Sequence, residues 1–577
     1  MAYDERASSL PNWLSRWNNT GARVGTTDVA RRLFSRDFVA GTITLGGNLA
    51  AGADSNYNVI VVGQGTFTSP PDQNQRPVVN AGPDSGVTLP NSASLNGTVS
   101  DDGLPNPPGA AIIQWSKVSG PGTVTFGSPS AVGTTATFSS AGTYVLHLTA
   151  SDGDLTASDD VTITALATSP GATIQLNPNI RHQTIVGWEA TADIGQRDFP
   201  NDFQRWRDEA SDQAVNQLGI NRLRLQTHQE KDAVERTNDN SDPFVINWNG
   251  FNFTEFDKKV DHIILPIKQR IEANGERLYI NFNTVAVADR NVNPVHINPE
   301  EFAELVLAHF LHMQTKYGFV PDAVEVSLEP DVFNTFDQDG AKLGAALVAT
   351  GDRLKANGFN VDFIAPSGSG TPSSIRLFDA MIQVPRVLEY LTEFAYHRYS
   401  AATPVQRIAA RAQQHNISTS MLEHIGADYN ELHEDLKVAN NVAWQQFTLA
   451  YPTTDNGAQY YNISNLSNPT VNIGSRAKFL RQYFKFIRAG AQRIEPTSGA
   501  SNFNPVAFIN TNGKYVVVVK ASGGGSFSVG GLPAGAYGIK YTTSSDYDVD
   551  LADAVIGSGQ SLTASIPDRG VITIYGK

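Results

Sequence analysis

The sequence predicts a multidomain chain in which a (β/α)8 barrel is fused to a C-terminal β-sandwich and follows two β-rich parts. Three observations lead to this fold class. Strand patterns alternate with helical patterns about eight times between residues 184 and 490. Residues 77–165 and the tail from about Pro505 carry instead short strands separated by turn residues. The length of 577 residues corresponds to roughly three or four domains.

The composition excludes several classes of protein. With 40% apolar and 17% charged residues, the chain can bury a large core and is not disordered as a whole. Its net charge of -14 argues against nucleic acid or an anionic membrane surface as a partner. It contains no cysteine, which excludes disulfides and thiol chemistry, and no apolar run long enough to span a membrane. We expect a monomer.

Residues 1–68 are expected to form a small β-rich unit, with strand-like runs at 32–38, 42–45 and 58–62. A polar, proline-rich linker with the sequence SPPDQNQR follows at 69–76. The first residues, MAYDERASS, lack the charged and then apolar pattern of a signal peptide. Because the lack of cysteine suits an exported bacterial protein, we expect secretion, with any signal peptide absent from this sequence.

Residues 77–168 are expected to form a β-sandwich, with strands at 111–117, 134–138 and 143–150. The run NAGPD, LNGTVSDDG, IQWSKVSGPG, AGTYVLHLTASDGD and DDVTIT resembles bacterial PKD-like modules of the immunoglobulin fold. The resemblance implies a spacer or surface-association module without catalysis. Asp101, Asp102 and Asp152 place carboxylates in its turns, where related modules often hold calcium, a cation that prefers such oxygen ligands. A solvated acidic turn is the alternative.

The barrel prediction rests on eight strand candidates in a row, each followed by a helical pattern. They lie at 184–188, 221–227, 277–283, 323–328, 360–365, 391–397, 418–422 and 441–447. A helix is predicted to begin after Asn298, because Pro299 and two glutamates follow this capping residue. Its apolar stripe comprises Phe302, Leu305, Val306, Phe310 and Met313. Such barrels carry their chemistry at the C-terminal ends of the strands.

Two glutamates stand at such strand ends. Glu329 lies in VEVSLEPD and Glu423 in STSMLEHIG, and each ends a run typical of a buried strand. A pair of carboxyl groups, one as acid and one as nucleophile or base, is what glycoside hydrolysis requires. The alternative is that either glutamate is a solvated residue just past a strand.

Strand alternation predicts which side chains face the barrel interior. Glu329 shares its face with Ser327 and Glu325, and Glu423 would share its face with Met421 and Thr419. We expect one of Arg222 and Arg224 to pair with Glu325, and the other to bond Glu423 and hold its pKa low. A buried ion-pair network without a catalytic role is the alternative.

Several further side chains are predicted to serve a binding site. Asn283 faces inward on the third strand, His397 is a candidate ligand of sugar hydroxyls, and Tyr399 is a candidate donor to Glu423. Trp188 and Trp444 could offer a ring face to a sugar or could pack in the core. No histidine spacing indicates a metal, so we expect no cofactor for catalysis.

Five segments together resemble a clan A retaining glycosidase, with glycoside hydrolase family 30 as the closest pattern. They are IQLNPNIRHQTIVGWEATADIG, SLEPD, AYHRYS, MLEHIG and FLRQYFKFIRAGAQRIEP. The resemblance implies a barrel at 185–490 and a β-sandwich built from residues 172–184 together with 491–577. It also implies that Glu329 is the acid/base and Glu423 the nucleophile, supported by Arg224, His397 and Tyr399.

The sequence departs from that family at one position. The family has Asn immediately before the acid/base glutamate, where it binds the sugar 2-hydroxyl, but this chain has Leu328. The contact is therefore missing or comes from another residue such as Asn283. The function expected from the resemblance is an endo-acting retaining β-glycosidase on a polysaccharide. An exo-acting β-glycosidase on an oligosaccharide or glycolipid, and a non-catalytic carbohydrate-binding protein on a degenerate barrel, are the alternatives.

Overall fold

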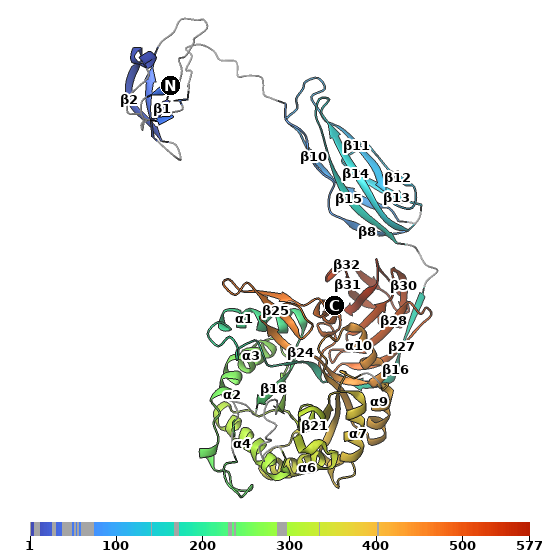
Figure 1. Cartoon of the computed structure of the whole chain (residues 1–577). Helices are drawn as coiled ribbons and strands as arrows, with labels where there is room; N and C mark the ends of the chain where they lie inside the picture. The colour runs from blue at the N-terminus through green and yellow to red at the C-terminus, as the bar shows by residue number, and fades with distance from the viewer. Residues whose placement is uncertain are drawn as a thin grey trace. The chain divides into compact units, whose positions relative to one another are not determined.

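A closed ring of eight parallel strands, β17 to β24, forms the centre of the chain (Figure 1). In this computed structural model the strands pair in sequence order, and β17 also pairs with β24, which closes the barrel. They are β17 Gly187–Thr191, β18 Arg222–His228, β19 Tyr279–Val285, β20 Ala323–Glu325, β21 Asp362–Gly368, β22 Leu391–His397, β23 Ser418–Glu423 and β24 Asn441–Tyr451. The predicted barrel is confirmed.

The structure describes most of the chain. The described residues are 2–4, 12–25, 30–36, 49–50, 53–54, 57–58, 74–89, 91–139, 141–166, 172–228, 234–235, 238–285, 297–333, 335–400 and 403–577. The predicted strand at 42–45 lies outside these residues, as do parts of those at 32–38 and 58–62.

The bounds of seven of the eight barrel strands differ from the prediction, by one to four residues. The first begins at Gly187 rather than Thr184, because residues up to Thr184 belong to strand β16 of the sandwich. Strand β20 ends at Glu325, although the apolar pattern continues to Leu328. Backbone bonds to the neighbouring strands continue beyond Glu325, since the Val326 N–H donates to the Ile364 carbonyl at 3.1 Å and the Leu328 N–H to the Thr284 carbonyl at 3.3 Å. The extended conformation ends at Glu329, whose φ is 42°.

Helices cover the outside of the barrel. They are α1 Gln204–Asp212, η2 Gln213–Leu218, η3 Trp248–Gly250, α2 Thr254–Lys259, η4 Val260–Ile264, α3 Leu265–Ala273, α4 Pro299–Tyr317, α5 Pro330–Phe333, η6 Thr335–Gln338, α6 Gly340–Ala356, α7 Thr371–Met381, α8 Val387–Tyr390, α9 Gln406–His415, α10 Tyr429–Glu434, η7 Asp435–Ala439 and α11 Ala477–Phe484. Helix α4 begins as predicted, with the Asn298 side chain accepting the Glu300 N–H, and its predicted apolar stripe is buried.

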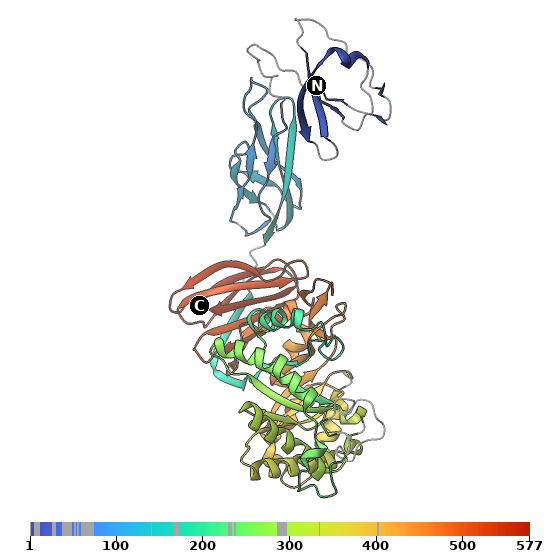
Figure 2. The ribbon, with the colours of Figure 1, turned by 90° about the vertical axis from the view of Figure 1, so that its left-hand side faces the viewer.

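A nine-stranded sheet follows the barrel and includes one strand that precedes it. Its strands are β16 Ala172–Thr184, β27 Gln492–Ser498, β28 Phe503–Ile509, β29 Tyr515–Ala521, β30 Gly525–Gly530, β31 Gly535–Thr543, β32 Val549–Ile556, β33 Leu562–Ile566 and β34 Gly570–Gly576. Strand β16 lies between β27, to which it is antiparallel, and β30, to which it is parallel. The blue-green β16 therefore runs among the orange and red C-terminal strands (Figures 1 and 2).

The barrel and this sheet share an apolar junction at α11. Tyr483 and Ile487 are fully buried there, and Phe479 and Phe486 are partly buried against the same core. The Thr573 hydroxyl donates to the Gln482 carbonyl at 2.7 Å, which ties β34 to the end of α11. An additional hairpin, β25 Gln459–Ser464 and β26 Thr470–Ile473, extends the barrel sheet beyond β24.

Residues 78–166 form the predicted sandwich. One sheet has the order β11-β14-β15-β8 and the other β12-β13-β9, and β10 pairs with β7. The strands are β7 Val78–Asn80, β8 Ser85–Thr88, β9 Ala93–Asn96, β10 Thr98–Ser100, β11 Ile112–Ser119, β12 Val124–Phe126, β13 Gly133–Phe138, β14 Gly142–Ser151 and β15 Thr156–Leu166. Trp115, Tyr144 and Leu146 are among its fully buried side chains.

The N-terminal unit contains a four-stranded sheet of order β2-β3-β1-β6 and a separate pair, β4 and β5. Its elements are β1 Ala2–Asp4, η1 Asn12–Arg16, β2 Asn18–Gly25, β3 Ala30–Ser35, β4 Leu49–Ala50, β5 Ala53–Asp54 and β6 Tyr57–Asn58. The predicted β-rich character of this unit is confirmed for the described part.

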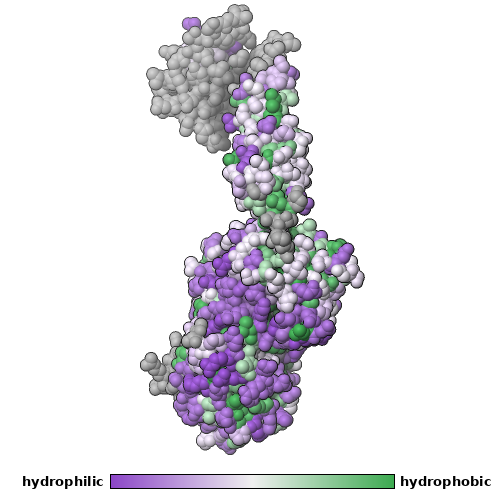
Figure 3. All heavy atoms as spheres, turned by 90° about the vertical axis from the view of Figure 1, so that its right-hand side faces the viewer, coloured by the Kyte–Doolittle hydropathy of each residue, from purple (hydrophilic) through white to green (hydrophobic). Residues whose placement is uncertain are grey.

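The surface of the barrel and its sheet is largely hydrophilic on the face seen in Figure 3, with small separated hydrophobic patches. The apolar side chains are instead collected in the barrel and sheet cores. None of the helices in the described residues has the length and apolar character needed to cross a membrane.

We predict that the C-terminal sheet cannot be removed from the barrel. Deletion of residues 500–577 would expose β16, β27 and the α11 junction, where each buried apolar side chain contributes about 1.5–3 kcal/mol. The truncated chain should therefore be insoluble or lack a cooperative thermal transition. Deletion of residues 1–168 is the matched control and should leave a folded barrel by circular dichroism. A soluble, cooperatively melting 1–499 fragment would contradict the shared architecture.

Candidate active site

The barrel interior holds two buried arginines on neighbouring inward positions of β18. Arg222 donates to both carboxylate oxygens of Glu393, at 2.9 and 3.1 Å, and also bonds Glu189. Its guanidinium lies 4.6 Å from the centre of the Tyr279 ring. All these charged groups are buried, so each requires its partner.

Arg224 connects this layer to the strand ends. Its Nη2 donates to Glu325 and its Nη1 to Glu423, each at 2.9 Å. Asn281 completes the shell by donating to Glu325 at 2.8 Å. We predicted one arginine for each of Glu325 and Glu423, which is wrong, since Arg224 serves both. The partners of Arg222 are two glutamates that the sequence analysis missed.

A β-bulge aims Glu423 into the barrel. Tyr396 pairs with Met421 but His397 pairs with Glu423, so Leu422 is an additional residue on β23. Leu422 lies in the interior cluster, while Met421 packs on the helix side and the Thr419 hydroxyl donates to Ala439. The predicted shared face of Glu423, Met421 and Thr419 is therefore wrong, because bulges re-aim side chains.

Glu329 is held by a strained turn after β20. Its φ of 42° is unfavourable for a residue other than glycine, and such strain is concentrated at functional sites. Its N–H donates to the Ser367 carbonyl at 3.0 Å. Asp331 accepts from the Ser369 N–H at 3.0 Å and the Ser369 hydroxyl at 2.6 Å. The turn is thus braced against the end of β21.

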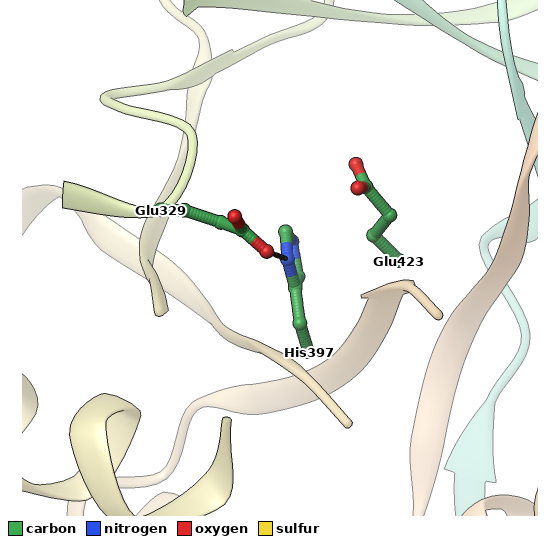
Figure 4. Close-up of side chains that lie close together, drawn as sticks. All are labelled: Glu329, His397 and Glu423. Carbon is green, nitrogen blue, oxygen red and sulfur yellow. Dashed lines mark hydrogen bonds and ion pairs between the residues drawn. The ribbon is translucent and has the colours of Figure 1, made fainter. Parts of the chain in front are cut away.

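His397 and Tyr399 bring the two carboxylates together. The His397 Nδ1 lies 2.8 Å from the Glu329 Oε1, and the Tyr399 hydroxyl donates to the Glu423 Oε1 at 3.0 Å. One ligand atom each from Glu329, His397 and Glu423 lies within 4.8 Å of the others. Figure 4 shows both carboxylates beside the His397 ring. Glu329 and Glu423 are only 7% and 6% exposed, so their charges are weakly screened by solvent.

Burial raises the pKa of Glu423 above its ordinary value, although the charges of His397 and Arg224 act to lower it. The negative charge of Glu329 acts in the same direction as burial. The predicted low pKa of Glu423 is therefore wrong, because the loss of hydration outweighs the ion pair. Burial also raises the pKa of Glu189 deeper in the barrel.

The two tryptophans pack in the core and present no ring face to a ligand. Trp188 is stacked on Phe484 at 4.5 Å and its Nε1 donates to the Ile487 carbonyl at 2.6 Å. Trp444 donates to Asp435 at 3.0 Å and is also fully buried. Their predicted contact with sugar is wrong because both lie on the helix side of their strands.

Asn283 lies in the barrel interior with both polar atoms engaged. Its Nδ2 donates to the Glu325 carbonyl at 3.3 Å, and its Oδ1 accepts from Gln226 at 3.4 Å. The side chain is fully buried. A sugar contact by Asn283 stays a prediction.

Two cavities open on the rim beside β17 and β18. Their volumes are about 490 and 310 Å³, and both are lined by Asp193, Arg197 and Gln226. Gln226 lies two residues beyond Arg224 on β18, but Glu329 and Glu423 do not line either cavity. Burial raises the pKa of Asp193 above its ordinary value. Both cavities therefore carry polar side chains on the part of the rim formed by β17 and β18.

The three aspartates of the N-terminal sandwich do not form one compact group. Among the described residues, only Glu329, His397 and Glu423 bring three such ligand atoms within 4.8 Å of one another. Asp102 is exposed and both of its oxygens accept backbone N–H groups. Asp101 Oδ1, Asp152 Oδ2 and the Asn74 side chain are buried without hydrogen-bond partners. Hydrogen bonds, chiefly from the Leu155 N–H, lower the pKa of Asp152.

Comparison with known proteins agrees with both parts of this architecture. A family of PKD domains matches residues 81–165. The catalytic domain of GH30 xylanase C from Talaromyces cellulolyticus has a TM-score of 0.56 and 16% identity, covering 70% of this chain and 100% of that one. A GH30 endoxylanase from Clostridium papyrosolvens has a TM-score of 0.53 and 19% identity, with coverage of 70% and 100%. At these identities the similarity shows the fold: a barrel with its fused β-sheet, as in these glycoside hydrolases.

We predict that the buried ion pairs of Arg222 with Glu189 and Glu393 are required for stability. Arg222→Met leaves Glu393 buried without a cation and Glu189 with Arg224 alone, at 3.7 Å, which should lower the free energy of unfolding by about 3–5 kcal/mol. Chemical denaturation followed by tryptophan fluorescence measures this change. Arg386→Met, in an exposed pair with Asp352, is the control and should cost no more than about 1 kcal/mol. Equal effects of the two substitutions would contradict the role of the buried layer.

Proposed function

We propose that this chain is a retaining glycoside hydrolase in which Glu423 is the nucleophile and Glu329 the general acid/base. The observation that carries the proposal is the approach of these two carboxylates at the barrel rim, with oxygens within 4.8 Å of each other. Retaining enzymes hold their carboxyl groups about 5–5.5 Å apart, whereas inverting enzymes leave about 6.5–9.5 Å for a water molecule. The approach of the nearest oxygens to within 4.8 Å is compatible with the shorter separation of a retaining enzyme.

The contacts of each glutamate support its role. Arg224 and Tyr399 occupy both oxygens of Glu423, which orients the carboxylate for attack on the anomeric carbon. Glu329 donates a proton to the departing glycosidic oxygen, and a covalent glycosyl-enzyme forms. Glu329 then removes a proton from water, which releases the sugar and regenerates Glu423. His397 keeps the Glu329 carboxyl in place through its Nδ1 contact.

A polysaccharide cut in its interior is the proposed substrate. The two rim cavities are both lined by Gln226 of β18, the strand that carries Arg224, and could hold sugar units of a polymer on that side of the rim. Modules like that at 81–165 commonly act as spacers or surface-association domains, which favours a secreted enzyme on a polymeric substrate. The two proteins compared above, which share this fold, are described as xylanases. A third protein with the same fold, at a TM-score of 0.50 and 16% identity, is described as an endo-β-1,6-glucanase. Exo-action on an oligosaccharide or glycolipid is the second candidate, and a polysaccharide panel analysed by product chromatography separates the two.

The two glutamates should respond differently to substitution. Glu423→Gln should abolish turnover of every substrate, because no covalent intermediate can form. Glu329→Gln should spare the first step on aryl glycosides whose leaving group needs no proton, while reducing turnover of the natural glycan by about 100-fold or more. Glu389→Gln on the exposed helix α8 is the control and should be unaffected. Equal losses on activated and natural substrates would refute the assigned roles.

We also propose that the PKD-like module binds calcium through Asp101, Asp152 and Asn74, whose unpartnered buried oxygens suit this cation. Calcium should raise the melting temperature of an isolated 70–168 fragment, and a chelator should reverse the rise. Asp152→Asn should abolish the response, whereas Asp160→Asn, exposed on β15, should retain it. An unchanged melting temperature in chelator and in millimolar calcium would refute the site.

A further inference from the structure

A second group of acidic side chains lies away from the two catalytic glutamates, between the segment after β18 and the first turns of α4. It comprises Glu235 and Asp239 from the segment and Glu301 and Glu304 from the helix. Glu235, Glu301 and Glu304 are 1%, 5% and 1% exposed. Because each barrel helix begins near the end of the preceding strand, this group belongs to the same rim as the two catalytic glutamates.

The carboxylate of Glu304 has no hydrogen-bond partner on either oxygen. The Oδ1 atoms of Asn238 and Asp239 are likewise buried without partners. Buried polar atoms in native proteins nearly always have a partner, and an unpaired buried carboxylate is especially costly. Glu304 therefore points to a ligand that supplies positive charge.

The arginine beside the group is already engaged. Arg353 donates to the Glu300 carboxylate at 2.6 Å and to the Glu300 carbonyl at 3.1 Å, and it also bonds the Pro243 carbonyl. Its guanidinium stacks at 4.5 Å on the Phe244 ring. It acts on Glu301 and Glu304 only through space, against the charges of Asp239 and Asp242.

Without a bound cation, protons must compensate for the buried charge. Burial, with the charges of Asp239, Glu304 and Glu301, raises the pKa of Glu235 to about 8. Burial, with Asp239 and Glu301, raises the pKa of Glu304 to about 7. Burial also raises the pKa of Glu301, against a hydrogen bond from Asn238. A bound cation would favour the ionised form of these carboxyl groups.

We propose that Glu235, Asn238, Asp239, Glu301 and Glu304 bind a divalent cation of the calcium type, which fastens the segment after β18 to helix α4. All the proposed metal ligands are oxygen atoms. Four of these residues contribute carboxylates and one contributes an amide. Calcium accepts six to eight such ligands in flexible geometry, whereas magnesium keeps most of its water and demands an octahedron. A site built mostly from protein oxygens therefore favours calcium.

The cation would also draw the two elements together. Among the described residues, no three of these carboxylates have oxygens within 4.8 Å of one another, which is wider than a closed coordination shell. A central cation would attract the ionised carboxylates and bring them closer together. Cation binding and the position of the segment are consequently coupled.

The segment is continuous with a wall of the larger rim cavity. Glu235 forms a bridge with Phe251, and the Asn252 N–H donates to the Val234 carbonyl at 2.7 Å. Helix α2 begins two residues later, and its Glu255, Phe256 and Lys259 line the cavity of about 490 Å³. A cation at the carboxylate group would thereby hold this cavity in shape.

The test uses the full chain and thermal melting, so it does not depend on the proposed activity. At pH 8, calcium at about 100 times its Kd should raise the melting temperature of the barrel transition by roughly 3 °C over chelator. Glu304→Gln should abolish the rise, and Asp239→Asn should weaken it. Glu272→Gln, on the exposed face of α3, should respond like the parent chain, and Asp152→Asn separates any calcium in the N-terminal module.

The pH dependence supplies a second readout. The pKa values of Glu235 and Glu304 are raised from 4.5 to about 8 and about 7, so their contribution to stability is fully present below pH 4.5 and is lost as the pH rises through the folded values. In chelator the melting temperature should therefore fall between about pH 4.5 and 8 and level off above, and calcium should reduce the fall. The proposal is overturned if calcium leaves the parent chain unchanged at pH 8 or if Glu304→Gln keeps the full rise. It is also overturned if Glu304→Gln stabilises the chain in chelator while calcium, magnesium and manganese have no effect. That result would mean that the buried carboxyl groups are protonated and bind no cation.

Discussion

The contact on which the site depends is the buried guanidinium of Arg224. It reaches from Glu325 to Glu423, and thereby fixes the ends of β18, β20 and β23 relative to one another. A fully desolvated cation is tolerated only when its carboxylate partners lie at hydrogen-bonding distance. The closure of the barrel and the orientation of Glu423 therefore depend on the same ion pairs of Arg224. A shift of any of these three strands would break an ion pair before it disturbed the apolar core.

Around this arginine the barrel contains more acids than bases. Glu189, Glu325, Glu393 and Glu423 face two guanidiniums, and Glu329 adds a fifth carboxyl group above them. The raised pKa values of Glu189 and Glu423 are the physical consequence of this excess together with burial. A barrel filled with Val, Ile and Leu would avoid the expense of desolvation. The buried charged side chains thus lower the stability of the barrel and position its reactive groups. Departures from the usual apolar core are expected at functional sites.

The sequence predicted the barrel, both sandwiches and the paired glutamates, because hydrophobic periodicity and strand ends are local signals. It also predicted the contacts of Tyr399 and the inward face of Arg224. It failed at Glu423, where an additional residue on β23 changes the alternation, since a bulge has no signature in a single sequence. Glu189 and Glu393 could have been found by extending the alternation along β17 and β22. The same alternation would have placed Trp188 and Trp444 on the helix side.

The pairing of β16 with β27 has a consequence for folding during protein synthesis. The Thr184 hydroxyl and its partner Gln492 are 308 residues apart, with the whole barrel between them. At a synthesis rate of about 5–20 residues per second, β16 waits roughly 15–60 s for its neighbour. Until then its apolar residues Ile174 and Leu176 have no sheet to enter. All eight barrel strands are therefore synthesised before β27, the strand that pairs with β16, leaves the ribosome.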